Sequence, residues 1–513
     1  MELLLVLVAI TLPLFLLLLK NYNASKSNRH APGPHGLPLI GNMHQFDSLN
    51  THLYLHQLSK EYGPLISLKL GSVKILVVAS VSAAKEVFKF HDLCFSNRPS
   101  SVAIQKLRPW SYNKLGFSFA PYDEYWRSMR KFSALHLFSA KRLRSFQPIR
   151  DEEIARMVRT IGDAAAADSG VVDLSKTFMT LTSSIIFRIT FGKRYDDQED
   201  CPEDGNNMRS QFHWLLAETQ ANVVSFFLTD YFPLMGRFLD RVSGAWARLE
   251  ESFSQTDAFY QQLIDEHLHA STVSTTGDCS ILDILLEMKK DSPVYTFDHV
   301  KAILMNIIVA ATDTTAAAIT WAMTLLIKNP ASMKKVQQEV RDLARQKGFV
   351  DEDDIQKLVY LKAVVKEAMR LHPPAPILHR ETTEKCVVSG YDIEAKTCVY
   401  VNTYAIGRDP ECWDNPDEFL PERFIESSID FRGHDFELIP FGAGRRICPG
   451  ISMGAATTEL VLANLLYSFD WELPAGKNRE DIDMATKPGL TVHKKNHLCL
   501  VPKISDQVSR MLI

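Results

Sequence analysis

The spacing of apolar and polar residues predicts a mainly helical chain with a few short strands. Across most of residues 120–469, apolar positions recur at every third or fourth residue, which is the pattern of amphipathic helices. The clearest predicted helices are 125–138, 152–166, 245–269, 297–328, 332–346 and 451–466. Alternating patterns predict a β-hairpin, with strands at 65–70 and 73–78 around a Gly-Ser turn, and further strands near 386–401. Because the chain has neither a repeat nor strand–helix alternation, a doubly wound or barrel fold is disfavoured.

The most hydrophobic stretch is the start of the chain. Residues 3–19 carry no charge, and as a helix they would extend roughly 25 Å, close to the apolar thickness of a bilayer. The acidic Glu2, the later basic residues Lys20, Lys26 and Arg29, and the lack of an A-x-A cleavage site favour an uncleaved anchor over a cleaved signal peptide. Since the basic residues follow the anchor, the positive-inside rule places the rest of the chain in the cytosol.

A stiff linker separates this anchor from the globular body. Residues 31–38 contain three prolines and two glycines, which cannot continue a helix. We therefore expect a transmembrane anchor at 1–20, a basic and proline-rich linker at 21–41 and a globular domain at 42–513. In this topology the glycosylation sequon at Asn23 would face the cytosol and stay unmodified.

Composition narrows the class of protein. The 513 residues are 46% hydrophobic and 23% charged, which is typical of a globular protein and excludes a disordered chain. The net charge of −4 shows no basic surplus, so we expect no nucleic-acid partner. The eight cysteines show no C-x-x-C spacing, which makes a disulfide framework or a cysteine zinc site unfavourable and indicates a reducing compartment.

The segment 440–450 is a glycine-rich loop that ends beside one cysteine, Cys448. An apolar helical pattern begins directly after it, so Cys448 lies just before a helix N-terminus, where the dipole favours an anionic sulfur. Gly442 and Gly444 let the backbone approach a flat ligand and can turn peptide N–H groups toward the thiolate. Arg446 would meet a carboxylate of such a ligand. The alternative for a lone cysteine is burial as a small apolar side chain.

This loop resembles the haem-binding loop of the cytochrome P450 family. Phe441, Gly444, Arg446, Cys448 and Gly450 match its pattern F-x-x-G-x-R-x-C-x-G. The resemblance implies a mainly α fold with small β-sheets, with haem b held between the long central helix and the helix after the cysteine. It also implies that Cys448 is the axial thiolate ligand of the haem iron, and that Phe441 and Arg446 contact the cofactor.

The predicted helix 297–328 would be about 48 Å long and carries polar residues at its centre. Asp313 and the neighbouring threonines are costly to bury unless they are satisfied, and threonine hydroxyls can simply bond the preceding turn and bend the helix. The segment resembles the family motif A/G-G-x-D/E-T-T/S. That resemblance implies that Thr314 hydrogen-bonds bound dioxygen and that Asp313 helps deliver protons. Ala311 replaces the usual glycine, so we expect a narrower groove that constrains the substrate pose.

A second resemblance concerns charged residues behind the cofactor. Glu367 and Arg370 lie three residues apart on one predicted helix face, which alone carries little weight because such pairs are common on surfaces. In the family, this E-x-x-R pair and a later arginine, here Arg423, form a buried ion network. We assign these three residues structural roles.

Further arginines are expected at the cofactor carboxylates. Trp126 and Arg130 resemble the family's W-x-x-x-R motif, which reaches the haem propionates, and bidentate geometry explains why lysine would substitute poorly. Arg380, which follows His379, resembles another propionate contact. The alternative for Trp126 and Arg130 is a packing indole beside a surface arginine.

The substrate pocket is expected from family analogy at residues that are mostly aromatic or aliphatic. These are Val102, Trp110, Phe117, Phe119, Phe212, Phe226, Phe227, Asn306, Ala310, 375–378, Gly489 and Leu490. Such a lining favours a hydrophobic or aromatic substrate, although each residue can equally be part of the core. The buried amide of Asn306 needs a partner, and we expect the substrate to provide it.

The resemblance therefore implies a membrane-anchored haem-thiolate monooxygenase of plant specialised metabolism, with 42–513 as the catalytic domain. Its substrate would be a lipophilic terpenoid, phenylpropanoid, alkaloid or aldoxime. Electrons would come from NADPH-cytochrome P450 reductase through a positive surface near Arg445, with Arg127 and Lys131 as candidates. The expected location is the endoplasmic reticulum membrane, with one span and a cytosolic catalytic domain. Two alternatives stay open, a haem-thiolate isomerase or dehydratase without oxygen activation and a non-catalytic haem-binding membrane protein, although Asp313 and Thr314 favour oxygen activation.

Overall fold

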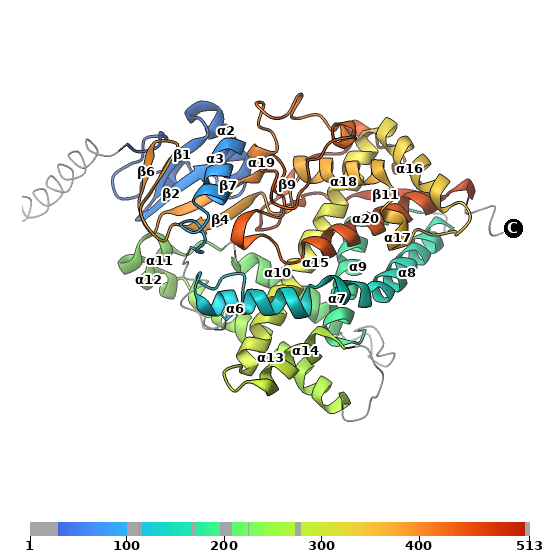
Figure 1. Cartoon of the computed structure of the whole chain (residues 1–513), viewed down its shortest axis with the longest axis horizontal. Helices are drawn as coiled ribbons and strands as arrows, with labels where there is room; N and C mark the ends of the chain where they lie inside the picture. The colour runs from blue at the N-terminus through green and yellow to red at the C-terminus, as the bar shows by residue number, and fades with distance from the viewer. Residues whose placement is uncertain are drawn as a thin grey trace, which may run out of the picture.

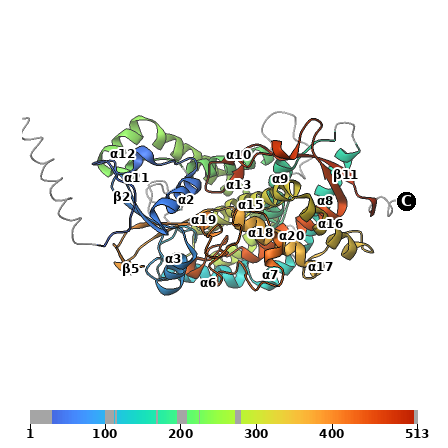
Figure 2. The same cartoon turned by 90° about the horizontal axis from the view of Figure 1, so that it is seen from above.

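Helices form most of the structure, and the largest sheet lies at one end of it (Figures 1 and 2). The computed structural model describes residues 29–99, 112, 115–166, 170–194, 208–223, 225–271 and 279–507. The α-helices are α2 (Thr51–Tyr62), α3 (Val81–Lys85), α6 (Glu124–Phe132), α7 (Ala140–Ser145), α8 (Gln147–Ala165), α9 (Leu174–Phe191), α10 (Met208–Val223), α11 (Leu228–Tyr231), α12 (Pro233–Val242), α13 (Ala245–Ser271), α14 (Ile281–Asp291), α15 (Phe297–Lys328), α16 (Pro330–Ala344), α17 (Glu352–Ile355), α18 (Val359–Leu371), α19 (Thr403–Ile406) and α20 (Ile451–Ser468). Shorter helical turns are η1 (Met43–Gln45), η2 (Glu86–Phe90), η3 (Ser133–Leu137), η4 (Pro421–Phe424), η5 (Gly444–Arg446) and η6 (Arg479–Asp481).

The strands form four small sheets. They are β1 (Leu65–Leu70), β2 (Val73–Val78), β3 (Val172–Asp173), β4 (Ile377–Glu381), β5 (Cys386–Val388), β6 (Tyr391–Ile393), β7 (Cys398–Asn402), β8 (Phe469–Glu472), β9 (Thr486–Lys487), β10 (His493–Lys494) and β11 (Cys499–Ile504). The largest sheet has the order β1-β2-β7-β4, in which only β2 and β7 are parallel. The others are β3-β11-β8, β10-β9 and β5-β6. This architecture confirms the expected mainly α fold with small sheets.

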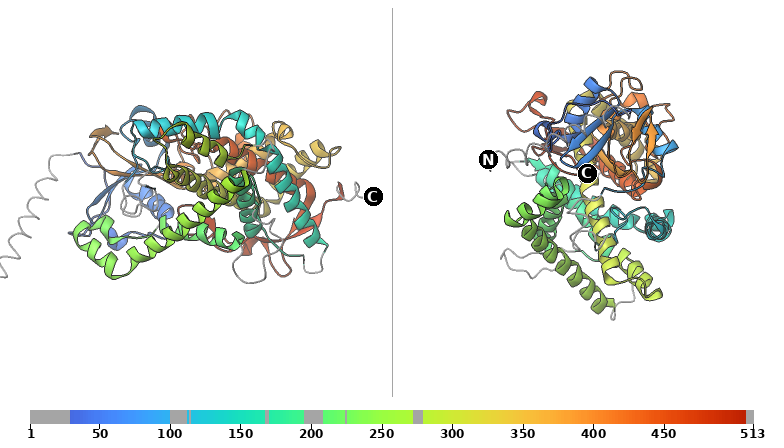
Figure 3. Two further views of the ribbon diagram at one scale, coloured as in Figure 1. Left: turned by 90° about the horizontal axis from the view of Figure 1, so that it is seen from below. Right: turned by 90° about the vertical axis from the view of Figure 1, so that its left-hand side faces the viewer.

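The centre of the molecule is α15, which packs against α9, α18 and α20 (Figure 3). Most of its residues are buried, so this long apolar helix lies inside the protein. Among the described residues it is the one helix long and apolar enough to span a membrane, and its burial marks it as a core helix. The predicted anchor at 1–20 lies outside the described residues.

Several predicted elements are confirmed at their bounds. The helix predicted at 297–328 is α15, and the hairpin strands predicted at 65–70 and 73–78 are β1 and β2. At the hairpin turn Gly71 has a φ of +57°, and a Cβ there would lie 2.6 Å from the Tyr231 carbonyl oxygen, so glycine is required on both counts.

The helix predicted at 125–138 differs from the structure. Its regular part, α6, ends at Phe132, and the chain continues through the wider π-helical turn η3. The buried hydroxyl of Ser133 donates to the Met129 carbonyl at 2.8 Å, while the Phe138 amide reaches back five residues to the Ser133 carbonyl. Hydrophobic spacing does not distinguish such a turn from α-helix, because the apolar positions stay on one side.

The described part of the linker packs on the sheet. The Ser67 amide donates to the Pro32 carbonyl at 2.8 Å, and a Cβ at Gly33 would overlap the Ser67 carbonyl oxygen at 2.1 Å. Further along, the Gly71 amide donates to the Ile40 carbonyl at 3.0 Å. The glycine content of this segment therefore serves close contact with β1 as well as breaking a helix.

Candidate active site

A cavity of about 310 Å³ lies between the middle of α15 and the loop that precedes α20. Its walls also include residues of α6, α9 and β4. Because side chains alternate along a strand, β4 directs Leu378 and Arg380 to this cavity. Most of the exposed surface inside the cavity is apolar, so a hydrophobic molecule is the natural ligand.

Cys448 lines this cavity, three residues before α20 begins at Ile451. Its backbone amide donates to the Phe441 carbonyl at 2.9 Å, which folds the loop back on itself. Burial raises the pKa of the Cys448 thiol, whereas the Gly450 backbone N–H and the positive charge of Arg130 lower it. Because burial has the largest effect on the pKa of Cys448, the thiolate form is disfavoured unless a further cation lies at the sulfur. A metal ion bound to the thiolate would supply that cation.

The backbone of the cysteine loop depends on two glycines in the left-handed region. Gly442 has a φ of +73° and Gly444 a φ of +68°. A Cβ at Gly444 would lie 2.4 Å from a carboxylate oxygen of Asp92, which accepts the Arg445 backbone N–H at 3.2 Å. Residues with a side chain would therefore strain this loop and displace Asp92.

Four arginines line the same cavity: Arg98, Arg130, Arg380 and Arg446. Among the described residues none of them forms an ion pair with a carboxylate. Burial lowers the pKa of Arg98 to about 10 and that of Arg446 to about 9, and the Nε atom of Arg98 is buried without a partner. Clustered, desolvated guanidinium groups are suited to binding carboxylates, and haem b carries two propionates. The cysteine, the apolar walls and these cations together fit that cofactor.

Arg98 is a residue that motif reasoning missed. It lies outside the motifs identified above, and only its contact with β4 in the folded chain shows that it belongs to the site. There Arg98 Nη1 donates to the His379 carbonyl at 2.5 Å, beside Arg380. The Phe-Ser-Asn-Arg-Pro context gives no periodicity or spacing that would single out this arginine.

Two predicted cofactor residues also hold the protein together. Arg446 donates to the carbonyls of Ser96 at 2.8 Å and Ala120 at 2.7 Å, and its guanidinium carbon lies 4.2 Å from the Trp126 ring centre. The Trp126 indole N–H donates to the Phe117 carbonyl at 2.8 Å. Both side chains line the cavity, but these hydrogen bonds fix the segment before α6 against the cysteine loop.

The polar centre of α15 is divided between two sides of the helix. Thr314 lines the cavity, and its hydroxyl donates to the Ala310 carbonyl at 2.6 Å. Asp313 does not line it and instead accepts a hydrogen bond from His493 Nε2 at 2.8 Å. The hydroxyl of Thr312 is buried without a partner. Ala311 also lines the cavity, as Thr314 does.

The expectation that the substrate satisfies the Asn306 amide is wrong. Asn306 lies at the cavity wall, but its Nδ2 donates to the Ala302 carbonyl at 2.9 Å and its Oδ1 accepts the Ser118 backbone N–H at 2.8 Å. Both ends of the amide are therefore used inside the protein. The amide ties the segment before α6 to α15, a contact between residues 188 positions apart that the sequence alone could not reveal.

Of the predicted pocket residues, some line the cavity and others do not. Those that line the cavity are Phe117, Asn306, Ala310, Ala375 and Leu378. Those that do not are Phe119, Phe212, Phe226, Phe227, Pro376, Ile377, Gly489 and Leu490, while Val102 and Trp110 lie outside the described residues. Phe226, for example, stacks on Tyr231 at 4.8 Å between ring centres and is half exposed. Successive side chains of a strand point to opposite faces of the sheet. Because Leu378 faces the cavity, Ile377 points into the core beneath the sheet.

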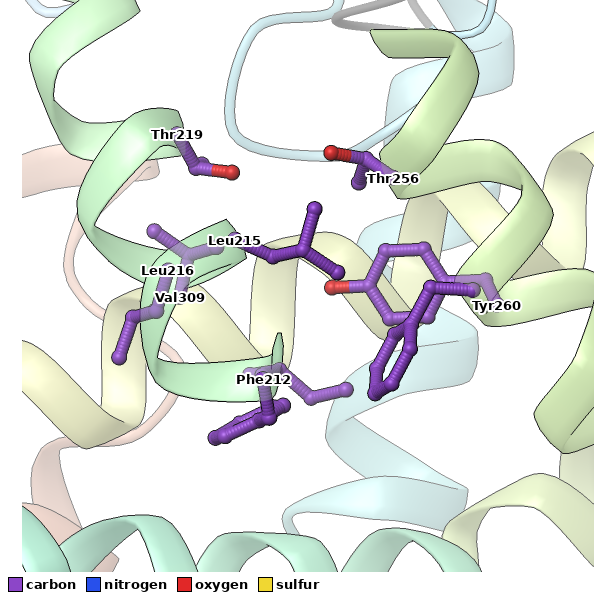
Figure 4. A pocket seen from close by; sticks show the side chains of 9 residues that line it. Phe212, Leu215, Leu216, Thr219, Thr256, Tyr260 and Val309 are labelled. Atoms are coloured by element: carbon purple, nitrogen blue, oxygen red, sulfur yellow. The ribbon is translucent and has the colours of Figure 1, made fainter. Parts of the chain in front are cut away.

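Phe212 lines a separate cavity between α10, α13 and α15 (Figure 4). Its other walls include Tyr260 and two threonines, Thr219 and Thr256, that lie on opposite sides of it. The volume of about 10 Å³ is no more than one water molecule requires. This cavity is too small to bind an organic substrate.

The predicted ion network of Glu367, Arg370 and Arg423 is confirmed. The Glu367 carboxylate accepts two hydrogen bonds from Arg370, at 2.7 and 2.8 Å, and one from Arg423 at 3.1 Å. The side chains of Glu367 and Arg370 are fully buried. Arg370 also donates to the Gly407 and Pro416 carbonyls, so α18 is fixed to the meander that leads to the cysteine loop.

Comparison with known proteins agrees with this geometry. The family model described as cytochrome P450 matches residues 31–501. The chain is 47% identical over 481 residues to 6,7,8-trihydroxycoumarin synthase of Pastinaca sativa, covering 92% of each chain. It is 46% identical over 492 residues to cytochrome P450 71A9 of Glycine max, covering 94% of each. It is 44% identical over 474 residues to strychnine-11-hydroxylase of Strychnos nux-vomica, covering 92% of this chain and 90% of that protein.

These relatives are oxygenating enzymes of plant specialised metabolism, which supports oxygenation over the isomerase and the non-catalytic alternatives. The protein is accordingly a haem b monooxygenase that oxidises a lipophilic plant metabolite and works with a redox partner and dioxygen. With a cysteine thiol, four arginines and a polar helix centre around one apolar cavity, the chain belongs to the cytochrome P450 family.

Proposed function

We propose that the enzyme hydroxylates a flat, aromatic phenylpropanoid derivative, of which coumarins and furanocoumarins are the nearest examples. The observation that carries this proposal is the apolar wall of small side chains, Ala310, Ala311 and Ala375, in the cavity that Thr314 also lines. A planar ring fits between such small side chains, and Phe117 offers an aromatic face at the same cavity. Relatives named for xanthotoxin and trihydroxycoumarin support this substrate class.

A substrate test follows from this proposal. We expect simple coumarins and furanocoumarins to shift the haem absorption spectrum on binding, and to yield products one oxygen atom heavier in the presence of NADPH and reductase. Mass spectrometry after incubation under ¹⁸O₂ measures the incorporated atom. Alkaloids and terpenoids of similar mass are the control ligands, and tighter binding and faster oxidation of these would overturn the proposed class.

The cofactor-binding roles are also part of the proposal. Cys448 would bind the haem iron, and bound haem would supply oxygen activation. Arg98, Arg130 and Arg380 would hold the propionates. Phe441 would pack near the sulfur, since a Cβ at Gly454 of α20 would lie only 3.5 Å from its ring. Arg446 and Trp126 would keep these groups in place through their backbone hydrogen bonds.

We assign proton delivery to Asp313 and Thr314. The Thr314 hydroxyl faces the cavity, and its hydrogen bond to Ala310 fixes the oxygen while leaving the lone pairs toward the cavity. Asp313, the residue before Thr314 in α15, is a buried carboxylate that bonds to the His493 imidazole. An acid adjacent to a cavity-facing hydroxyl can move protons to a reacting oxygen without admitting bulk water.

Thr314→Ala should uncouple the reaction. We expect normal haem content and substrate binding, but a coupled rate lower by on the order of 10²-fold, with reduced oxygen released as hydrogen peroxide. Product formed per NADPH consumed measures this effect. Thr314→Ser should restore coupling, and Thr320→Ala, which removes a similar buried hydroxyl bonded to the Ala316 carbonyl, should leave it unchanged. Normal coupling in Thr314→Ala would contradict the assignment.

We place the docking surface for NADPH-cytochrome P450 reductase on the outer face of α6. Arg127 and Lys131 are exposed there, four residues apart and hence on one side of the helix. Arg445 is half exposed nearby in the cysteine loop, but its guanidinium is 3.3 Å from Asp92 and donates to the Tyr122 hydroxyl. The free positive charges of this face are therefore mainly those of α6.

Reversing these charges should slow electron transfer. For Arg127→Glu/Lys131→Glu we expect roughly tenfold slower reduction by the reductase at low ionic strength, because opposite charges steer the encounter, and an unchanged substrate affinity. Stopped-flow formation of the carbon monoxide complex measures the rate. Lys503→Glu, on β11 at a distant part of the surface (Figure 1), is the matched control. Equal rates for the double variant and the control would refute this docking surface.

We propose that the chain is anchored in the endoplasmic reticulum membrane by residues 1–20, with the catalytic domain in the cytosol. Exposed apolar side chains support contact with a bilayer at the end of the molecule where the described part of the linker lies. They are Leu39, Leu234, Met235, Phe238 and Val242, each at least 69% exposed. The hairpin turn connects them, because Gly71 bonds to Ile40 of the linker and Ser72 to Tyr231 of α11. Figures 1 and 2 show α11 and α12 beside β1 and β2.

A further inference from the structure

We propose that His493 carries protons from solvent to Asp313, and so feeds the proton delivery by Asp313 and Thr314 on which this inference rests. His493 Nε2 lies 2.8 Å from Asp313 Oδ1. The His493 side chain is 26% exposed, whereas that of Asp313 is 7% exposed. The imidazole therefore has one edge in water and the other against the buried carboxylate. It acts through Asp313 and is a positioning residue rather than one that touches the reacting atoms.

The fold holds this imidazole against α15. The residue before it, Val492, donates its backbone N–H to the Pro374 carbonyl at 2.8 Å, and its carbonyl accepts the Trp321 indole N–H at 2.9 Å. Trp321 belongs to α15 and stacks on His372 with 4.0 Å between the ring centres. Pro374 lines the cavity. The strand that carries His493 is thus fixed both to the helix of Asp313 and to the cavity wall.

Neighbouring charges leave Asp313 and His493 as a pair. Lys487 lies opposite His493 in the register of β9 and β10, and is exposed. The ammonium of Lys494, the next residue of β10, is 2.9 Å from the carboxylate of Asp483. In the described part of the chain no lysine or arginine pairs with Asp313. A buried carboxylate is normally held by a permanent cation, whereas here the partner that the structure describes is an imidazole.

The step is a proton transfer without electron transfer. His493 takes a proton from hydronium at Nδ1, where an N–H bond forms as an O–H bond of hydronium breaks. It gives its Nε2 proton to the Asp313 carboxylate, where an O–H bond forms as the Nε2–H bond breaks. Exchange with water then returns the neutral ring to its starting tautomer. Insertion of one oxygen atom into a substrate consumes two electrons from the reductase and two protons, which leave with the second oxygen atom as water. His493 would supply these protons through Asp313 while bulk water stays outside the cavity.

His493→Gln separates proton transfer from positioning. A glutamine amide can still donate an N–H to Asp313 Oδ1, but it does not take up protons. We expect normal haem content and substrate binding, several-fold less product per NADPH, more hydrogen peroxide and a larger solvent isotope effect in D₂O. His497→Gln is the matched control, because His497 also bonds to an aspartate, with Nδ1 2.7 Å from Asp173, but is 58% exposed in the loop before β11.

A second readout does not depend on turnover. In histidine-labelled holoenzyme, as the diamagnetic ferrous carbon monoxide complex, the ¹⁵N signals missing in His493→Gln identify this ring. We expect these signals to shift in Asp313→Asn and the His497 signals to stay in place. Unchanged His493 signals in Asp313→Asn would overturn the pairing.

The outcomes separate this inference from the proton role of Asp313. If Asp313→Asn uncouples the enzyme but His493→Gln behaves as the wild type, the inference about His493 fails and the role of Asp313 stands. If neither variant uncouples it, both fail. If both uncouple it but the solvent isotope effect of His493→Gln equals that of the wild type, proton transfer by His493 is also refuted. Uncoupling in both variants together with a larger solvent isotope effect in His493→Gln supports it.

Discussion

Cys448→Ala is expected to abolish activity and to remove the long-wavelength absorption band that a thiolate-bound haem gives with carbon monoxide. Among the described residues Cys448 is the one cysteine that lines this cavity, and the thioether sulfurs of Met369 and Met453, which also line it, carry no anionic form. Alanine keeps the backbone hydrogen bond from residue 448 to the Phe441 carbonyl, so the loop should retain its shape. The loss therefore tests ligation rather than folding.

Two further variants make this result decisive. Cys448→His supplies a different ligand and should bind haem while giving a carbon monoxide band at shorter wavelength. Cys412→Ala changes an exposed cysteine and should keep the full thiolate spectrum. Persistence of the thiolate band in Cys448→Ala, at the intensity of the wild type, would mean that another residue binds the iron and that the site is wrongly assigned.

Arg370→Ala should cause the largest loss of stability. The substitution leaves the Glu367 carboxylate buried with the Arg423 guanidinium as its one remaining cation, and also removes the donors that satisfy the Gly407 and Pro416 carbonyls. Removing one partner from such a buried network typically costs about 3–5 kcal/mol, a large share of the stability of most proteins. We expect a strongly lowered denaturation midpoint and poor haem incorporation, measured by urea unfolding and by the haem-to-protein ratio.

A conservative and a surface variant calibrate this loss. Arg370→Lys keeps a charge but cannot form both hydrogen bonds to Glu367, so its loss should be intermediate. Lys74→Ala breaks an exposed ion pair with Glu394 at 2.7 Å, in which both side chains are about half exposed, and should cost less than about 1 kcal/mol. Equal losses for Arg370→Ala and Lys74→Ala would contradict a structural role for the buried network.

Local patterns predicted the elements and motifs that depend on neighbouring residues. The bounds of α15, the β1–β2 hairpin and the loop before Cys448 follow from periodicity and glycine placement within short windows. The pattern at 152–166 found the interior of α8 but missed its start at Gln147, where Pro148 occupies the first turn. Helix ends depend on such capping details more than on the apolar stripe.

Contacts between distant residues could not be predicted in this way. His493 lies 180 residues from Asp313, and the Ser118 amide lies 188 residues from Asn306. Only the folded chain shows that Asn306 is already satisfied and that Asp313 has an imidazole partner. Arg98 was missed for the same reason, because its environment is created by β4. Resemblance to a family led to motif residues of which several line the cavity, but it extended the pocket to aromatic residues that do not line it.

The internal use of the Asn306 amide has a consequence for how such an enzyme acquires new chemistry. The amide of Asn306 and the hydroxyl of Thr314 form hydrogen bonds within the protein. When polar groups of a cavity wall are used in this way, substrate recognition depends mainly on the shape of the cavity. One methylene group more or less in an apolar site changes the discrimination between two substrates by only about 10–200-fold. Single substitutions of the wall alanines can therefore change the substrate preference stepwise without passing through an inactive enzyme. Selectivity built in this manner is easily remodelled over evolutionary time, and a lineage that carries it can diversify its products while oxygen activation stays intact.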